Sequence, residues 1–199
     1  MKGMAQRPPG APSAIGVVRY FTPGQCIFSE DNPAAHFMLV VGGLVRSCSI
    51  FADGRRFIGA FYAPGDIFGF EPGTYRATAE AVCETSLVVY HTADLTGSRQ
   101  MMDSMMHRID QSCAHARRLG RFSAIERLAS FLLECSDRAP QRQMLTLEMT
   151  RQDIADYLGL TVETVSRSLQ QLCREGLIDI ISPRQLVLCD IATLRAISL

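Results

Sequence analysis

The stretch that decides the fold is TRQDIADYLGLTVETVSRSLQQLCREG, residues 150–176. It opens with a capping box, Thr150-Arg-Gln-Asp153, which starts a helix, and Gly159 ends that helix. Thr161 can cap a second helix, whose apolar stripe is Val165, Leu169 and Leu172. Two short helices joined by a tight turn that contains glycine predict a helix-turn-helix.

The outer face of the second predicted helix carries Glu163, Ser166 and Arg167, at spacings i, i+3 and i+4 within the first two turns. When a helix-turn-helix binds DNA, the N-terminal part of its second helix enters the major groove. Arginine can donate two hydrogen bonds to guanine, glutamate can accept one from cytosine, and serine can bond to either neighbour. We therefore expect these three residues to contact bases. The alternative is a solvated pair between Glu163 and Arg167 that has no role in binding.

Several polar side chains lie at the starts of the two helices, where free backbone N–H groups favour phosphate. The expected phosphate contacts are Thr150, Arg151, Gln152, Thr161 and Thr164. After Gly176, two strands at Leu177–Ile181 and Gln185–Cys189 surround Ser182-Pro183-Arg184. This hairpin predicts a wing beside the helices, with Arg184 at its tip.

The residues before the helices have a strand-rich pattern, with turn residues every eight to twelve positions and no helical period. Asp53-Gly54 is a hairpin turn within this series. The expected strands are Val17–Phe21, Phe37–Val41, Leu44–Phe51, Arg56–Tyr62, Ile67–Phe70, Ala77–Val82 and Ser86–Tyr90. The pattern predicts an antiparallel sandwich or jelly roll.

The period then changes to a 4-3-4-3-4 spacing of apolar or small residues, which is the seam of a coiled coil. The seam residues are Met102, Met106, Ile109, Cys113, Ala116 and Gly120. The seam narrows toward Gly120, as expected where two identical helices approach closely, so we expect a homodimer. The alternative is a helix packed only on its own domain.

A further helix is expected from Ser123 to Glu134, because Ser123-Ala-Ile-Glu126 is a capping box. A polar loop at 136–143 and a short strand at 144–147 follow. The predicted organisation is α+β: a flexible arm (1–14), an antiparallel β-roll of the sensor type (15–95), a dimerisation helix (96–122) and a winged helix-turn-helix domain (123–199).

The composition excludes several classes of protein. Lys and Arg number 20 and Asp and Glu number 20, so DNA binding is not visible in the net charge of zero. No run of about 18 apolar residues predicts a membrane span, and the N-terminus lacks the apolar stretch of a signal peptide. The seven cysteines are scattered and never spaced as CxxC, which indicates neither a disulfide framework nor a zinc site and favours the cytoplasm. No catalytic-triad, metal-spacing or phosphate-loop motif suggests an enzyme.

The order of a strand-rich domain, a long seam helix and a winged helix-turn-helix resembles the cyclic-AMP receptor protein/Fnr superfamily of bacterial regulators. The resemblance is most specific from Leu147 to Arg167 and covers the chain from about Val17 to Leu188. Within the superfamily, Glu163-x-x-Ser166-Arg167 is similar to the Fnr and FixK branch, whose half-site is TTGA. The resemblance implies a dimer that binds a TTGA-N6-TCAA-type palindrome, recruits RNA polymerase and acts in low-oxygen or nitrogen-fixation regulation.

The N-terminal domain departs from the ligand-binding members of this superfamily. Residues 1–25 contain no cysteine, although an Fnr-type cluster needs four thiolates. Nucleotide binders pair a Gly-Glu segment with Arg-Ser/Thr-Ala, whereas this chain has Gly69-Phe-Glu71 and then Arg76-Ala-Thr78. The four histidines have no setting that indicates haem: His36, His91, His107 and His115. We therefore expect no cofactor and a FixK-like activator that needs no effector; the alternative is a regulator gated by a small ligand such as a cyclic nucleotide.

A separate hypothesis concerns one thiol as a redox-sensitive site. Cys173 follows Arg167 by less than two helical turns and precedes Arg174. Oxidation to a sulfenic or higher acid would add bulk and negative charge where a phosphate must lie. Cys173 is therefore a candidate redox site, with an inert thiol as the alternative.

Overall fold

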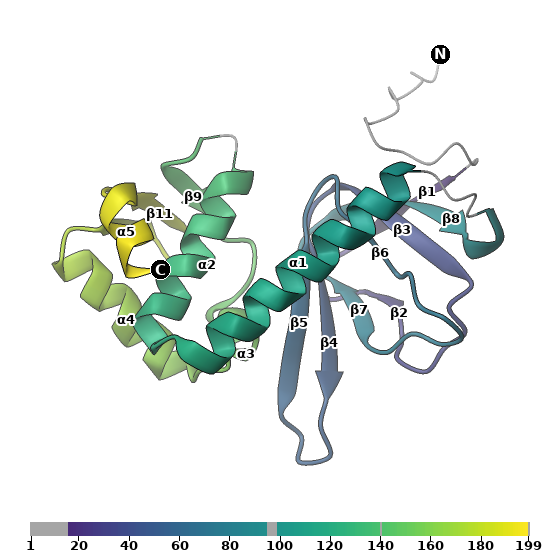
Figure 1. Ribbon diagram of the computed structural model, residues 1–199, viewed down its shortest axis with the longest axis horizontal. Coiled ribbons are helices and arrows are strands. Elements are labelled where there is room, and N and C mark those ends of the chain that lie inside the picture. The colour runs from purple at the N-terminus through teal and green to yellow at the C-terminus, as the bar shows by residue number, and fades with distance from the viewer. Residues whose placement is uncertain (1–15, 95–98, 140, 199) are drawn as a thin grey trace. The chain divides into compact units, whose positions relative to one another are not determined.

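The computed structural model describes residues 16–94, 99–139 and 141–198 (Figure 1). The chain forms two compact units, and the division between them falls after Asp110, inside helix α1 (Arg99–Arg121). The predicted arm, residues 1–14, and positions 96–98 of the predicted dimerisation helix lie outside the described residues.

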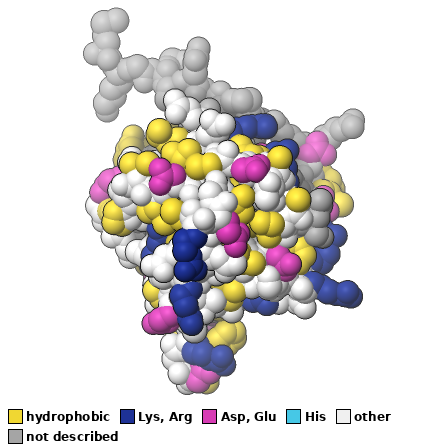
Figure 2. Space-filling model, turned by 90° about the vertical axis from the view of Figure 1, so that its left-hand side faces the viewer, with side chains coloured by type: hydrophobic (Ala, Val, Ile, Leu, Met, Phe, Trp, Pro, Cys, Tyr) yellow, Lys and Arg dark blue, Asp and Glu magenta, His cyan; other side chains and the backbone are white. Residues whose placement is uncertain are grey.

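One face of the molecule carries side chains of both charges (Figure 2). On the face seen in Figure 2, basic and acidic side chains lie among hydrophobic ones, as expected for a chain with no net charge. None of the helices described is long and apolar enough to cross a membrane.

The first unit contains two four-stranded antiparallel sheets, so the predicted β-roll is confirmed. One sheet has the order β1 (Val17–Phe21), β8 (Thr85–His91), β3 (His36–Gly42) and β6 (Ile67–Phe68). The other has the order β2 (Cys26–Phe28), β7 (Thr78–Ala81), β4 (Val45–Ile50) and β5 (Arg56–Tyr62). The 3₁₀ turn η1 (Thr92–Asp94) follows β8.

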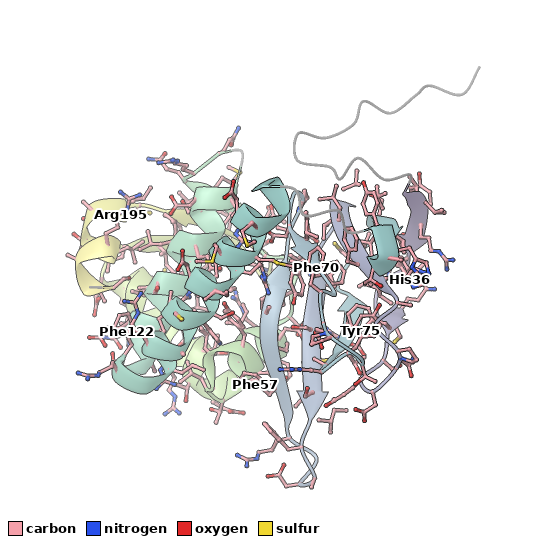
Figure 3. The ribbon with its side chains drawn as sticks, turned by 45° about the vertical axis from the view of Figure 1, so that its right-hand side comes forward. His36, Phe57, Phe70, Tyr75, Phe122 and Arg195 are labelled. Carbon is pink, nitrogen blue, oxygen red and sulfur yellow. The ribbon has the colours of Figure 1, made fainter. Side chains whose placement is uncertain are left out.

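Strand β3 is buried on both faces, which explains its nearly continuous apolar sequence. Phe37 and Leu39 point to one side, where the Phe37 ring stacks on those of Phe70 and Tyr90 with centroids 4.6 and 5.1 Å apart (Figure 3 labels Phe70). Met105 of α1 packs against this group. The N-terminal part of α1 therefore packs against this face of the sheet through Met105.

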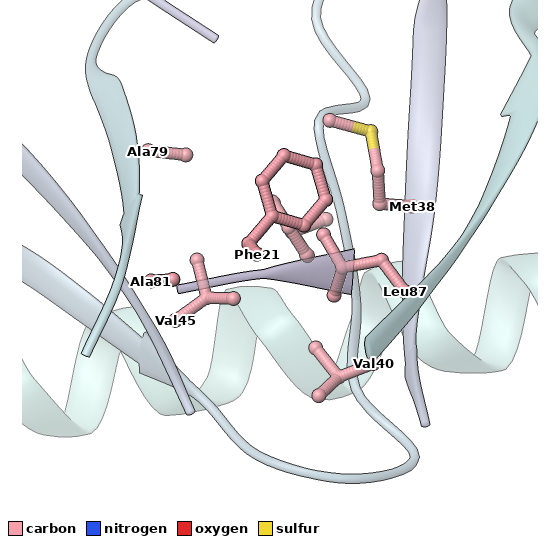
Figure 4. Close-up of a cluster of buried hydrophobic side chains, with 8 residues drawn as sticks. Phe21, Met38, Val40, Val45, Ala79, Ala81 and Leu87 are labelled. Atoms are coloured by element: carbon pink, nitrogen blue, oxygen red, sulfur yellow. The ribbon is translucent and has the colours of Figure 1, made fainter. Parts of the chain in front are cut away.

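The other face of β3 contributes to the core between the sheets. This cluster draws side chains from both sheets (Figure 4): Phe21, Met38, Val40, Val45, Phe68, Ala79, Ala81 and Leu87. The alternation of side chains along each strand thus fills the interior of the roll.

Two strands of the roll differ from the expectation by more than one residue at an end. The pattern missed β2, which has only three residues and does not alternate clearly. Strand β6 ends at Phe68 rather than Phe70, because Gly69 has a φ of 84° and turns the chain out of the sheet.

The second unit contains the rest of α1, four further helices and a three-stranded antiparallel sheet of order β10-β11-β9. The helices are α2 (Ala124–Arg138), α3 (Arg151–Leu158), α4 (Val162–Arg174) and α5 (Ile191–Ile197). The strands are β9 (Met144–Thr146), β10 (Ile178–Ser182) and β11 (Gln185–Leu188). The predicted helix-turn-helix and its wing are therefore present, while α5 was not predicted.

Helix α2 continues beyond the predicted end at Glu134, so the expected loop at 136–143 was wrong in its first three residues. Ser136 is 2% exposed and its hydroxyl donates to the carbonyl of Arg142. Nη2 of Arg138 lies 3.7 Å from Oε1 of Glu134, one helical turn earlier. The polar residues that suggested a loop are thus bonded within or beside the last turn of the helix.

A buried histidine joins α1 to α3 in this unit. The His115 ring stacks on Tyr157 with centroids 4.1 Å apart, and neither ring nitrogen has a hydrogen-bond partner among the described residues. Burial, followed by the positive charge of Arg118, lowers the pKa of His115 from 6.5 to about 4, although Glu134 of α2 opposes the shift. His115 is therefore neutral in the folded protein at neutral pH.

The stability of the second unit should fall in mild acid for this reason. Below pH 6.5 the unfolded chain binds a proton at His115 that the folded chain does not bind until about pH 4, so stability is complete above 6.5 and is lost as the pH falls toward 4. Between pH 7 and pH 5 we expect a loss on the order of 2 kcal/mol from this group. Urea unfolding of the wild type and of His115→Phe measures it. An equal pH dependence in both proteins would show that His115 is not the cause.

Candidate nucleic-acid interface

Helix α3 begins with a reciprocal cap. The Thr150 hydroxyl accepts from the backbone N–H of Asp153 at 3.1 Å and donates to the Asp153 carboxylate at 2.9 Å. The same carboxylate accepts from the Thr150 backbone N–H at 3.0 Å, and Asp153 is 1% exposed. The predicted capping box therefore fixes the start of α3.

The turn between the helices depends on Gly159. This residue has a φ of 62°, the left-handed conformation that favours glycine, and its N–H donates to the carbonyl of Ala155. Fully buried side chains of the two helices form the interior of the motif: Ile154, Ala155, Leu158, Val165 and Leu172. This packing holds α4 with one face outward.

The three residues predicted to contact bases lie on that outward face. Glu163 and Arg167 are exposed and Ser166 is half-buried. Arg167 Nε donates to the backbone carbonyl of Glu163 at 3.4 Å, not to the Glu163 carboxylate. The printed bond therefore joins the Arg167 side chain to the backbone of α4, and the Arg167 charge also lies close enough to act on the Glu163 carboxylate.

The Glu163 carboxylate is held in its charged form. Its pKa is lowered first by the backbone N–H of Glu163 itself, then by the Thr161 hydroxyl and the Arg167 charge. Glu163 sits in the first turn of α4, where the helix dipole also favours an anion. An ionised carboxylate only accepts hydrogen bonds, so Glu163 suits a donor such as the cytosine amino group.

The predicted phosphate contacts all lie at the starts of α3 and α4, but each already has a partner within the protein. Thr161 caps α4 and its hydroxyl lies 3.1 Å from that of Thr164. Gln152 Nε2 donates to Asp156 at 2.6 Å. Arg151 Nη2 donates to the carbonyl of Pro183 at 3.1 Å, and burial lowers the Arg151 pKa. Arg151 thus ties α3 to the turn of the wing.

The wing is anchored to the rest of the unit by its backbone. Gln185 N–H donates to the Ser182 hydroxyl at 3.1 Å, which closes the hairpin turn. The carbonyl of Arg184 accepts from the Leu147 N–H at 2.7 Å, while the Arg184 side chain is exposed. An exposed cation is therefore fixed at the tip of the hairpin.

The six predicted seam residues are all exposed along α1. Met102, Met106 and Ile109 are 62%, 52% and 54% exposed, although each is large and apolar. The smaller Cys113, Ala116 and Gly120 continue the same stripe. In a single chain, a stripe of this kind leaves its apolar side chains exposed to water.

Cys173 lies in the last turn of α4 and is half-buried, while Arg174 beside it is exposed. The cysteines are free among the described residues, and no group of three or more His, Cys, Asp or Glu side chains there could hold a metal ion.

The segment from Gly69 to Thr78, whose pattern departs from that of nucleotide binders, has an inward-facing aromatic ring. Tyr75 is 3% exposed, stacks on Phe28 with centroids 3.7 Å apart and donates to the carbonyl of His36 at 2.7 Å. Arg76 is exposed, and its backbone N–H donates to the Glu71 carboxylate. The arginine side chain therefore faces solvent, while the tyrosine packs inside the roll.

Comparison with known proteins agrees with both units. Residues 126–197 match the model of the Crp-like helix-turn-helix domain, and residues 18–98 match that of the cyclic nucleotide-binding domain. The nitrogen fixation regulation protein FixK of Azorhizobium caulinodans is 40% identical over 203 residues, which cover 95% of this chain and 82% of that protein. The chain belongs to the Crp/Fnr family.

Its likeness is to the FixK branch of that family. FixK of Rhizobium meliloti is 34% identical over 95% of this chain and 90% of its own length. The solved structure of FixK2 from Bradyrhizobium japonicum superposes with a TM-score of 0.89 at 37% identity and covers 94% of this chain and 98% of that one. The protein is thus a FixK-like transcription regulator with a helix-turn-helix DNA-binding domain, and it is not an enzyme.

Proposed function

We propose that this regulator binds, as a homodimer, a TTGA-N6-TCAA-type palindrome and activates transcription without a small-molecule effector. The observation that carries the proposal is the outward face of α4, with ionised Glu163 beside Ser166 and exposed Arg167. Glu163 supplies a hydrogen-bond acceptor, Ser166 a hydroxyl, and Arg167 a bidentate donor. Together these groups suffice to distinguish base pairs in the major groove.

The exposed stripe on α1 supports the dimer. Two copies of α1 that pair through this stripe would bury Met102, Met106 and Ile109, and the small residues would let the helices approach at the other end. A two-fold dimer presents two copies of α4 to half-sites one helical turn apart. The four base pairs of one half-site and the six of the spacer give that separation.

The packing around Tyr75 supports activity without an effector. In nucleotide binders the arginine of this segment pairs with the phosphate, but here the Arg76 side chain is exposed and an aromatic stack of Phe28 and Tyr75 fills the adjoining interior. Tyr75 is buried and donates to the carbonyl of His36, so this part of the interior is filled by the chain's own side chains.

The biological setting and the partners follow from the relatives. Both FixK proteins are named as regulators of nitrogen fixation. We infer the same kind of role here, in low-oxygen or nitrogen-fixation regulation in the cytoplasm, with RNA polymerase as the protein partner at the promoter.

Equilibrium binding by effector-free protein tests the proposal. Fluorescence anisotropy should give nanomolar affinity for the palindrome, within the usual range of about 10⁻⁸–10⁻¹¹ M for specific sites at physiological salt. Added cyclic nucleotide should change neither this affinity nor the melting temperature. Specific binding only with nucleotide, together with thermal stabilisation by it, would favour the ligand-gated alternative.

Oxidation of Cys173 is a separate proposal at the same interface. Because the thiol is half-buried near the end of α4, an added acid group there would oppose DNA phosphates. Peroxide treatment should inhibit DNA binding by the wild type and leave Cys173→Ser active. Cys189→Ser is the matched control, since Cys189 is exposed in the same unit but outside α4. Equal inhibition of the wild type and Cys173→Ser would rule the proposal out.

A further inference from the structure

Arg127 occupies a position where a positive charge is normally unfavourable. Ser123 caps α2, so Arg127 is the fourth helical residue and lies close to the positive end of the helix dipole. Its side chain is half-buried. A cation placed there needs compensation from another part of the protein.

The compensation comes from three backbone carbonyls. Arg127 Nε donates to Phe122 at 2.9 Å, Nη2 to Leu119 at 2.8 Å and Nη1 to Leu158 at 3.0 Å. All three nitrogens of the guanidinium are therefore bonded to main-chain oxygens. A planar group with several donors in fixed directions can make these bonds at once, whereas the single ammonium of lysine cannot span them.

The three carbonyls belong to the ends of two helices. Leu119 and Phe122 lie in the last turn of α1 and directly after it, and Leu158 is the last residue of α3. Carbonyls at helix C-termini lack partners within their own helix and carry the negative end of the dipole. Arg127 thus satisfies both helix ends with one charged group.

The turn of the helix-turn-helix lies at the same point. A Cβ atom added to Gly159 would lie 3.5 Å from Leu119 Cδ2 and 3.6 Å from Arg127 Nη1. The C-terminal end of α1 therefore packs directly on the turn that leads into α4 (Phe122, labelled in Figure 3, marks this end of α1). The contacts hold the end of α1 at a defined position relative to the DNA-binding helices.

From these contacts we propose that Arg127 is a positioning residue that fixes the α3–α4 motif relative to the end of α1, and so sets the spacing of half-sites that the dimer accepts. The inference rests on the proposed function, in which α1 forms the dimer and α4 contacts the bases. Arg127 itself touches no DNA in this account. Without it the motif would pivot at the end of α1, and the two copies of α4 would no longer be held one helical turn apart.

The test measures spacing preference with the full-length dimer. Wild type, Arg127→Lys and Arg127→Met are bound by anisotropy to palindromes whose half-sites are separated by five, six or seven base pairs. Each added base pair rotates one half-site by about 35° relative to the other, so a rigid dimer should prefer one spacing by about tenfold or more. Arg138→Met is the matched control: it removes the same charge from the other end of α2, and Arg138 makes none of the three carbonyl bonds.

We expect the wild type and Arg138→Met to keep the preference, and both Arg127 variants to bind the three spacings within about threefold of one another. A loss of stability alone would weaken binding to all three DNAs equally and leave the preference intact. An unchanged preference in folded Arg127→Lys would overturn the proposal. Failure of both variants to fold would also overturn the proposal, because Arg127 would then be required for folding rather than for positioning the α3–α4 motif. A wild type without any spacing preference would refute the proposed palindrome instead.

Discussion

Arg167→Ala should weaken binding to the specific palindrome by about 1–3 kcal/mol per half-site, and should relax discrimination at one base pair. Arg167 is exposed, and its described bond to the Glu163 carbonyl is long. Its removal should therefore leave the folded structure and the melting temperature unchanged. Anisotropy on the palindrome, on single-base variants of it and on random DNA measures the effect.

A comparison with Arg174→Ala separates base contact from charge. Arg174 is exposed in the last turn of the same helix, so its loss removes the same charge. We expect Arg174→Ala to weaken specific and random DNA alike, and Arg167→Ala to act mainly on specific DNA. Glu163→Ala should loosen the preference at a different base pair. If Arg167→Ala weakens both DNAs equally, Arg167 contacts phosphate and not a base.

Ile109→Lys should convert the proposed dimer into a monomer at micromolar concentration. Ile109 is 54% exposed in the single chain but would be buried against its copy in the dimer, where an uncompensated charge typically costs about 3–5 kcal/mol, or at least a hundredfold in dimer affinity. Lysine is as good a helix former as isoleucine, so α1 itself should persist. Sedimentation equilibrium measures the mass of the protein in solution. The affinity for the palindrome should fall as the dimer is lost.

Asp110→Asn is the control for Ile109→Lys, because it changes the net charge by the same amount at an exposed neighbouring position outside the seam. It should remain dimeric. If Ile109→Lys also remains dimeric, the α1 stripe is not the dimer interface. A lower melting temperature without a change of mass would instead indicate that α1 packs only on its own chain.

The local sequence was sufficient for the features that depend on neighbouring residues. The caps at Thr150 and Ser123 and the helix end at Gly159 involve residues within a few positions of each other, and the structure has them as predicted. Strands β1 and β5 have the expected bounds because turn residues limit them on both sides. The outward face of α4 followed from the helical period alone.

Features that depend on contacts between distant residues were not predictable. The role of Arg127 arises from carbonyls up to 31 positions away, and no local pattern identifies a group that bonds to backbone. Likewise, the hydrogen bond from Arg151 to the carbonyl of Pro183 joins residues 32 positions apart, and no local pattern predicts it. Helix α5 begins at an Asp190 cap but is only seven residues long, too short for a clear period.

Selection of binding sites from random duplexes by effector-free protein tests the central claim most directly. We expect enrichment of TTGA and TCAA as an inverted repeat separated by six base pairs, with no change when a cyclic nucleotide is added. Enrichment of an unrelated or unpaired motif, or enrichment that appears only with the nucleotide, would contradict it.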